Sequence, residues 1–408
     1  MRVLLDCTMT CRQPELMTGI QRVVHEIVRR CRSLAPDNVE CLPVRFAAGA
    51  WRPVGDRIPG DQVLGVLRAA AASGRARRKE ARVAIAEGRC AACLHWLFGQ
   101  LLYTLASALC SLVKRVRVPA AGEELVLRPG DTLVLLDTFA IRPEVIAAQR
   151  AGARVEAVIH DIIPITHPHF FVGGNADLVR WFDWSANHAS RLHATTEYVR
   201  GTLRGHYGAA CPEVRVFPLG ADLPLAQAGL PRPALAHAVG DRTFLMVGTL
   251  EPRKGHACAL DAFELCWARG SDARLLVLGR VGWMTEALVR RMRSHPELGR
   301  RLHVFHDADD ADLAHAYRGC RALVAASAVE GFGLPLVEAA QHGLPVLASD
   351  IPVFREVASD ATYFRVDDAG DLARAILSEL ERSPRRLPGR RWVSWEESVR
   401  RLLRGIVA

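Results

Sequence analysis

The sequence predicts an α/β protein built from two Rossmann-like domains, whose parallel sheets face each other across a cleft. Short apolar runs alternate with stretches of helical periodicity, and they form one series in each half of the chain. Strands that are apolar along their whole length are typical of parallel sheets covered on both faces, and helices between them are typical of βαβ units. Between the two series, residues 220–240 are rich in Pro, Gly and Ala, which predicts a domain boundary.

The length and the charge agree with this fold class. A chain of 408 residues is long enough for two cores of ordinary size. Because half of its residues are hydrophobic, the protein is not extensively disordered. Lys and Arg number 53 against 44 Asp and Glu, which gives a net charge of +9 and favours anionic partners such as phosphates, nucleic acid or a membrane surface. A solvated basic surface is the alternative explanation.

The apolar runs predict strands at residues 3–5, 39–44, 132–136, 155–159, 192–195, 214–217, 244–247, 274–278, 302–305, 322–325, 345–348 and 362–364. The first domain is expected to span residues 1–222 and the second residues 223–390. Residues 391–408 are expected to form an amphipathic helix that packs back on the first domain. We expect Ser394 to cap this helix, with Glu397 completing a capping box.

A helical insertion is expected at about residues 63–117 of the first domain. It is rich in alanine, has a basic stretch at 75–82, and carries a largely apolar run at 96–113 followed by further basic residues. That run approaches membrane-spanning length, but the polar residues within it favour an interfacial or core helix. Docking on a membrane surface and packing inside the protein remain equal alternatives.

The cysteines predict neither disulfides nor a metal site. Eleven of them are scattered through apolar segments, with no signal peptide before them, so we expect reduced thiols and a cytoplasmic protein. Cys90 and Cys93 form a lone CxxC without a second pair at zinc-finger spacing. We therefore expect no metal and no cofactor.

The stretch "EGFGLPLVE" joins a buried strand to a helix and carries a carboxylate at each end, Glu330 and Glu338. Glu330 is expected at the carboxyl end of the strand, and Glu338 in or just past the first helical turn. The amides of Gly331, Phe332 and Gly333 lie at the start of that helix, before Leu334, where an anion binds readily. A ligand with hydroxyls at two ends and phosphate between them, such as a sugar nucleotide, fits this pattern.

A second loop supplies positive charge. "GTLEPRKG" follows the first strand of the second domain and places Arg253 and Lys254 at the start of the next helix, after Gly248 and Thr249. Two cations there would neutralise a diphosphate and stabilise a leaving group. The alternative is ordinary surface charge.

The first domain contributes two further candidates. His160 and Asp161 follow an apolar strand and are expected to point into the cleft, where the imidazole would donate a hydrogen bond to a sugar hydroxyl or move a proton. A structural histidine, with Asp161 capping a turn, is the alternative. Gly19 opens a helix and permits close approach of a ligand. The absence of a GxGxxG motif weakens any NAD hypothesis.

Together these motifs resemble retaining glycosyltransferases of the GT-B fold, most closely glycosyltransferase family four. The resemblance covers nearly the whole chain, and "DIPVFREV" at residues 350–357 adds to it. It implies an acceptor-binding first domain and a second domain that binds a nucleotide sugar. In that family the residue matching Glu330 contacts the donor sugar, and the residue matching Glu338 holds the ribose hydroxyls.

The resemblance also assigns roles to the other candidates. Lys254 matches the lysine that binds the diphosphate, His160 a histidine near the transferred sugar, and Gly19 the glycine loop near the diphosphate. Residues 305–308 are expected near the base. Many family members carry arginine where this chain has Thr249, a departure that leaves the second cation to Arg253. The insertion at 63–117 lies outside the common core of the family.

The function implied is retaining, metal-independent transfer of a sugar from a nucleotide diphosphate sugar to a glycan or lipid-linked saccharide. Mannose is the first expectation and rhamnose the second, in bacterial surface polysaccharide synthesis, on the cytoplasmic side and with a possible contact to the inner membrane surface. Glu330, Lys254 and His160 are the expected catalytic residues. Two alternatives remain: a sugar-nucleotide epimerase of the same fold and a non-catalytic nucleotide-binding protein. Nucleic acid is not expected as a partner, because the acidic site residues would repel it.

Overall fold

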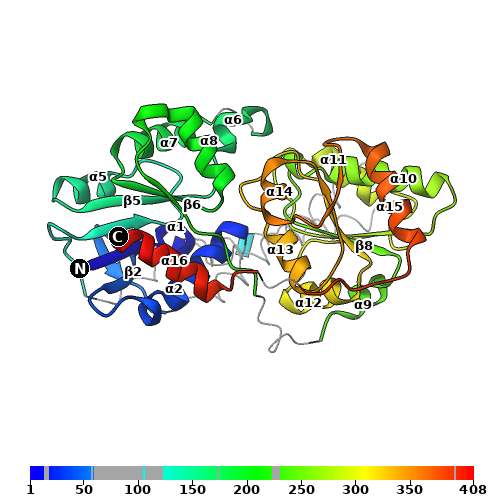
Figure 1. The fold of residues 1–408 in the computed structure, drawn as a ribbon, viewed down its shortest axis with the longest axis horizontal. Helices are drawn as coiled ribbons and strands as arrows, with labels where there is room; N and C mark the ends of the chain where they lie inside the picture. Colours follow the sequence, from blue (N-terminus) through cyan, green and yellow to red (C-terminus); the bar gives the residue numbers. More distant parts are fainter. Residues whose placement is uncertain are drawn as a thin grey trace.

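The computed structural model describes residues 1–12, 18–56, 58, 104–105, 123–171, 173, 175–222, 230–389 and 392–408. Apart from residues 104–105, the insertion predicted at 63–117 lies outside these ranges, as does the pair Cys90 and Cys93. Figure 1 shows two α/β units side by side, the first coloured from blue to green and the second from green to orange.

The first unit is built on a seven-stranded sheet of order β3-β2-β1-β4-β5-β6-β7. Its strands are β1 (Arg2–Asp6), β2 (Glu40–Ala47), β3 (Ala50–Pro53), β4 (Thr132–Leu135), β5 (Arg154–Ile159), β6 (Arg191–Ala194) and β7 (Val214–Val216). All neighbours are parallel except β2 and β3. β3 was not predicted. It forms a tight hairpin with β2 through Ala48 and Gly49, which both have positive φ, as a type I′ turn requires.

The second unit contains a six-stranded parallel sheet of order β10-β9-β8-β11-β12-β13. Its strands are β8 (Thr243–Val247), β9 (Arg274–Leu278), β10 (Leu302–Phe305), β11 (Ala322–Ala325), β12 (Val346–Ser349) and β13 (Thr362–Phe364). Every predicted strand is therefore present. The chain passes from one sheet to the other between residues 216 and 243, and the expected boundary after residue 222 falls beside residues 223–229, which are outside the described ranges.

Helices cover both faces of each sheet. Those of the first unit are α1 (Thr8–Arg12), α2 (Gly19–Leu34), α5 (Pro143–Arg150), α6 (Ile163–Thr166), α7 (Ala176–His188) and α8 (Glu197–Tyr207). Those that follow are α9 (Pro233–Ala238), α10 (His256–Ala268), α11 (Glu286–Arg293), α12 (Asp310–Gly319), α13 (Leu334–Gln341), α14 (Pro352–Val357), α15 (Ala369–Glu381) and α16 (Trp395–Val407). Alternate residues of β1 show the two-sided burial, since Val3 and Leu5 pack with α2 and α16 whereas Leu4 packs with α5 and α7.

The last helix, α16, returns to the first unit, as predicted. It packs along α2, and both chain ends lie on this side of the molecule (Figure 1). The Ser394 hydroxyl accepts a hydrogen bond from the Glu397 amide at 3.1 Å, so the predicted cap is present. The Glu397 carboxylate instead accepts from Arg401 at 2.9 Å, which means that the predicted reciprocal bond of the capping box is wrong.

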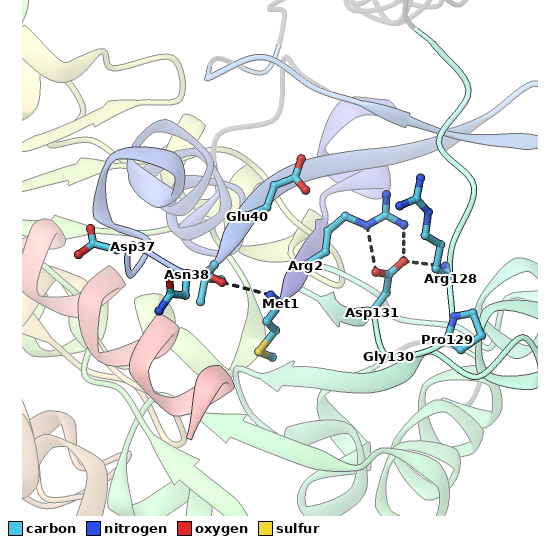
Figure 2. A pocket seen from close by; sticks show the side chains of 10 residues that line it. Met1, Arg2, Asp37, Asn38, Glu40, Arg128, Pro129, Gly130 and Asp131 are labelled. Atoms are coloured by element: carbon cyan, nitrogen blue, oxygen red, sulfur yellow. Dashed lines mark hydrogen bonds and ion pairs between the residues drawn. The ribbon is translucent and has the colours of Figure 1, made fainter.

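A hollow of about 630 Å³ opens at the amino ends of β1 and β2 (Figure 2). On its wall Arg2 Nε donates to Asp131 Oδ1 at 3.0 Å, and the Arg128 amide donates to Asp131 Oδ2 at 2.7 Å. Ligands of doubly wound sheets bind at the opposite, carboxyl ends of the strands. This hollow is therefore not the candidate active site.

The fold generates a prediction about Gly220, which lies against the start of α16. A Cβ at this position would lie 2.4 Å from the Cα and the backbone nitrogen of Trp395. Because backbone atoms cannot yield without moving α16, we predict that Gly220→Ala lowers the free energy of unfolding by about 1–3 kcal/mol. Urea unfolding followed by circular dichroism measures this change.

The matched control is Gly205→Ala within α8, where no described atom lies within 4 Å of an added Cβ. This variant should gain about 0.5–1 kcal/mol, because glycine is unfavourable inside a helix. Equal stability of the two variants would contradict the packing described for α16.

Candidate active site

The candidate active site lies where the carboxyl ends of strands from both sheets meet. Loop 248–255 follows β8, and loop 326–333 follows β11 and leads into α13. Opposite them, His160 and Asp161 follow β5, and Thr195 and Thr196 follow β6. The sequence places each of these loops directly after a buried parallel strand, so the chemistry gathers at one edge, as in other doubly wound sheets.

Gly331 is a point of close contact between the two units. Its carbonyl accepts hydrogen bonds from the hydroxyls of Thr195 at 3.3 Å and Thr196 at 3.0 Å. A Cβ on Gly331 would lie 2.1 Å from the carbonyl oxygen of His160. Only glycine permits this contact, which explains the first glycine of the Gly-x-Gly turn.

Glu330 is buried and accepts hydrogen bonds from three side chains. Its carboxylate accepts from Arg253 Nη1 at 2.8 Å, from Ser327 Oγ at 2.8 Å and from the ammonium of Lys254. Burial alone would raise the pKa of the Glu330 carboxyl, but Lys254 and Arg253 outweigh it and lower this pKa to about 2. The structure thus joins the two predicted cations and the first predicted carboxylate in one ion cluster.

Arg253 is engaged on several sides. Besides Glu330, its guanidinium pairs with Glu251 at 3.0 Å and donates to the Val329 carbonyl at 3.3 Å. Burial would lower the pKa of this guanidinium, but Glu330, Glu251 and Asp161 together raise it. The interpretation of Arg253 as ordinary surface charge is therefore wrong.

Glu338 is also buried, but it is held by residues that the sequence analysis did not name. Its Oε1 accepts from Arg22 Nη1 at 2.5 Å, and its Oε2 accepts from the Tyr317 hydroxyl at 2.6 Å. Arg22 belongs to α2 of the first unit, so this ion pair joins the two units. Burial raises the pKa of the Glu338 carboxyl, and Arg22 opposes that rise. Glu338 is the fifth residue of α13 and lies past its first turn.

His160 and Asp161 adopt a fixed arrangement. His160 Nε2 lies 3.1 Å from the Leu136 carbonyl oxygen, and burial lowers the pKa of the imidazole. A neutral ring that donates through Nε2 presents Nδ1 as an acceptor, so the imidazole can accept a further hydrogen bond but cannot donate one. Asp161 Oδ1 accepts from the Ile163 amide at 3.0 Å, which is the capping role given above as the alternative.

The remaining candidates lie beside these residues. A Cβ on Gly19 would lie 3.8 Å from Leu334 Cδ1, so the starts of α2 and α13 are neighbours. Gly248 has a φ of +145° and lies next to the Lys254 side chain. Farther out, in the segment expected near a base, His306 Nδ1 lies 2.9 Å from the Gly279 carbonyl oxygen. Thr249 lies in the same loop as Gly248, against Gly282.

The chain is similar to several known proteins. Residues 231–388 match the family model described as Glycosyl transferases group 1. The serotype-specific mannosyltransferase WbdA of Escherichia coli is 37% identical over 311 residues, which cover 70% of this chain and 38% of WbdA. The phosphatidyl-myo-inositol mannosyltransferase of Mycolicibacterium smegmatis is 37% identical over 166 residues, or 40% of each protein.

A solved structure decides the fold. Anabaena Alr3699/HepE, in complex with UDP and glucose, matches with a TM-score of 0.60 and 15% identity over 100% of this chain and 94% of that one. The chain has the GT-B fold, and its residues 231–388 match a glycosyltransferase family model. Family four is consistent with these findings. The chain covers 38% and 40% of the lengths of the two curated relatives named above.

Within the described ranges of this chain, no group of three His, Cys, Asp or Glu is placed to hold a metal ion. None of the helices described above is long and apolar enough to cross a membrane.

His256 is a further residue that the sequence analysis missed. It opens α10, is buried, and lines a cavity of about 20 Å³ together with Lys254 and Glu330. Neither of its ring nitrogens has a hydrogen-bond partner among the described residues. Burial and the charge of Lys254 lower its pKa to about 3, so the imidazole beside the ion cluster is neutral. Its position directly after "RKG" was the signal available in the sequence.

The ion cluster predicts how stability depends on pH. Because the folded-state pKa of Glu330 falls from 4.5 to about 2, its contribution is present above pH 4.5 and is lost as the pH falls toward 2. That difference corresponds to at most about 3 kcal/mol. Between pH 6 and pH 3.5, the free energy of unfolding measured with urea should fall more for the wild type than for Glu330→Gln.

The control is Glu286→Gln, which lies on the exposed side of α11 and should lose as much stability as the wild type. If the wild type lost no more stability than Glu330→Gln, the prediction would be contradicted.

The ion pair between Arg22 and Glu338 predicts a second effect on stability. Arg22→Met leaves the buried Glu338 carboxylate without its cation, so we expect a loss of about 2 kcal/mol, less than for a fully buried pair because Arg22 is partly exposed. Adding Glu338→Gln should recover most of this loss. Arg29→Met is the control, since Arg29 is half exposed and 3.9 Å from Glu26, and it should change stability by less than about 0.5 kcal/mol. Additive losses in the double variant would show that the pair is unimportant.

Proposed function

We propose that this chain is a glycosyltransferase that moves a hexose from a nucleotide diphosphate sugar to a hydroxyl of a glycan or lipid-linked saccharide, with retention at the anomeric carbon. The observation that carries the proposal is the Glu330 carboxylate held by Lys254 and Arg253 at the carboxyl ends of β8 and β11. Carboxylates bind sugar hydroxyls and cations bind diphosphates, and here the two lie in direct contact.

The ion cluster supports a sequence of events. A donor diphosphate competes with Glu330 for Lys254 and Arg253, and it releases the carboxylate to bind the donor sugar. Positive charge then faces the phosphate oxygen that gains negative charge as the glycosidic bond breaks, which is where electrostatic stabilisation acts on the rate. The amides of residues 331–333 add to it. The proposal needs no metal, because the two side chains supply the charge.

The proton of the acceptor hydroxyl passes to the leaving phosphate, so we assign no protein base. His160 accepts a hydrogen bond from the transferred sugar through Nδ1 and so orients it. Glu338 binds the ribose hydroxyls of the donor, which compete with Arg22 for this carboxylate. Gly19 and Gly248 leave room for the diphosphate, and Thr249, Phe332 and Leu334 complete its surroundings.

Mannose is the proposed sugar and GDP-mannose the proposed donor. The relatives named above carry the word mannosyltransferase, and another relative is named O-antigen chain mannosyltransferase B. Rhamnose is the second candidate. These names favour transfer over epimerisation and over binding without catalysis. A lipid-linked acceptor would place the enzyme on the cytoplasmic surface of a membrane.

The first test is thermal stabilisation by GDP, UDP, dTDP and ADP. A ligand that binds the folded state alone stabilises it by about 2.7 kcal/mol at a hundred times its Kd. We expect GDP to raise the melting temperature most, and Glu338→Ala to remove the shift. Glu381→Ala removes an exposed carboxylate at the end of α15 and should keep it.

The transfer step is then measured with radiolabelled GDP-mannose and a panel of mannosides. Labelled product from the wild type, and none from Glu330→Ala, is the expected result. A chain that responds to none of the four nucleotides would refute the proposed function.

A further inference from the structure

An aromatic cluster joins the two domains at one side of the candidate active site. It consists of Phe170, Phe171 and His169 from the first domain and Trp283 from the second. Trp283 Nε1 donates a hydrogen bond to the Phe170 carbonyl at 2.7 Å, and the Trp283 and Phe171 rings stack with centroids 5.8 Å apart. The ring of His169 lies 4.2 Å from that of Phe170.

The cluster is connected to the ion cluster from both sides. Gly282, next to Trp283, packs so closely on loop 248–255 that a Cβ there would lie 2.4 Å from the Leu250 carbonyl oxygen and 3.1 Å from Glu251 Cγ. Glu251 in turn pairs with Arg253, the partner of Glu330. On the first domain, the chain runs from Asp161 through the single turn of α6 to Phe170.

The backbone next to Trp283, at Met284, has an unfavourable conformation. Met284 has a φ of +55°, a left-handed conformation that is unfavourable for a residue with a Cβ by roughly 1–2 kcal/mol. Its side chain is exposed, whereas the neighbouring Trp283 is half-buried against the first domain. Strain of this kind persists where the surrounding structure requires it, and it is concentrated at ligand sites.

The chemistry of the cluster differs from that of the donor site. Its walls are aromatic rings, and burial lowers the pKa of His167, which stacks on Phe170 and is therefore neutral at neutral pH. The cluster contains no Lys or Arg side chain that would bind a diphosphate. The C–H faces of a pyranose ring, in contrast, pack well on aromatic rings, and half-exposed aromatic residues at a domain interface are typical of ligand sites.

The structure therefore points to a neutral saccharide as the occupant. A nucleobase also stacks on aromatic rings, but Trp283 lies on the Glu251 side of Arg253, whereas the proposed ribose site is at Glu338 beside Arg22. We propose that Trp283, Phe171 and Phe170 form the platform on which a sugar ring of the glycan acceptor packs. This rests on the proposed function, since it assigns the second substrate of the same site.

The test measures saccharide binding separately from nucleotide binding. Methyl α-D-mannopyranoside and an α-linked mannotriose are titrated into the full chain at saturating GDP, and binding is followed by saturation-transfer NMR. We expect Trp283→Ala and Phe171→Ala to weaken mannotriose binding at least tenfold while the GDP-induced rise in melting temperature stays unchanged. Trp283→Phe, which keeps a ring but loses the indole donor, should bind with intermediate affinity.

Trp184→Ala is the matched control, because Trp184 is a half-buried tryptophan on α7 that stacks on Trp181 and His188 away from the cluster. It should bind mannotriose as the wild type does. If Trp283→Ala bound mannotriose with the affinity of the wild type, the proposal would be overturned. It would also be overturned if the wild type responded to GDP but bound neither saccharide. Loss of the GDP response in Trp283→Ala would also overturn it, in favour of a nucleobase platform or of domain closure. Absence of any GDP response in the wild type would instead refute the proposed function.

Discussion

The buried carboxylate of Glu330 is the group on which the arrangement of the second domain depends. A charge in this position is tolerated only with partners, and Lys254, Arg253 and Ser327 supply them. These partners come from the loops after β8 and β11, so the one carboxylate holds the two loops together. The backbone strengthens the link, since the Ala328 amide donates to the Arg253 carbonyl at 2.8 Å. Gly255, at a φ of +70°, lets these loops approach at Ala326.

The two domains are joined by contacts of different kinds. Between α16 and α2 the contact is apolar and extensive, and it fixes the C-terminal helix on the first domain. Elsewhere the domains meet through the stacked rings of Trp283 and Phe171 and through polar contacts: Arg22 with Glu338, Thr196 with Gly331, and Glu356 with the amides of Glu197 and Tyr198 at 2.8 and 2.9 Å. Polar contacts can be exchanged for water or ligand groups at little net change in free energy, whereas an apolar seam cannot. The polar contacts are therefore the ones that a bound donor can replace.

The sequence predicted the fold well because its signals are local. Each parallel strand is an apolar run, and each site loop follows directly after such a run. β3 escaped prediction because it is a short edge strand defined by its pairing with β2 rather than by its own pattern. Glu330, Lys254 and Arg253 were found from motifs, but their mutual contact was not, since 76 residues separate Lys254 from Glu330.

The missed residues share a physical cause. Arg22 is one of many arginines in a basic chain, and only the fold brings it to Glu338, 316 positions away. Tyr317 and His256 likewise stand out only through their surroundings in the fold. Tyr317 contacts the Glu338 carboxylate, and His256 lines a buried cavity. The acceptor role of His160 Nδ1 follows from the Leu136 carbonyl, which the spacing of the motif does not reveal.

The central claim is that Glu330 competes with the donor diphosphate for Lys254 and Arg253, and acts on the sugar once it is released. Calorimetric titration of GDP into the wild type and Glu330→Gln, together with the turnover number of each, tests it most directly. The account predicts that the variant binds GDP at least as tightly as the wild type while its turnover falls about 100-fold or more. A GDP affinity that falls in parallel with turnover would contradict it, because Glu330 would then support nucleotide binding instead of opposing it.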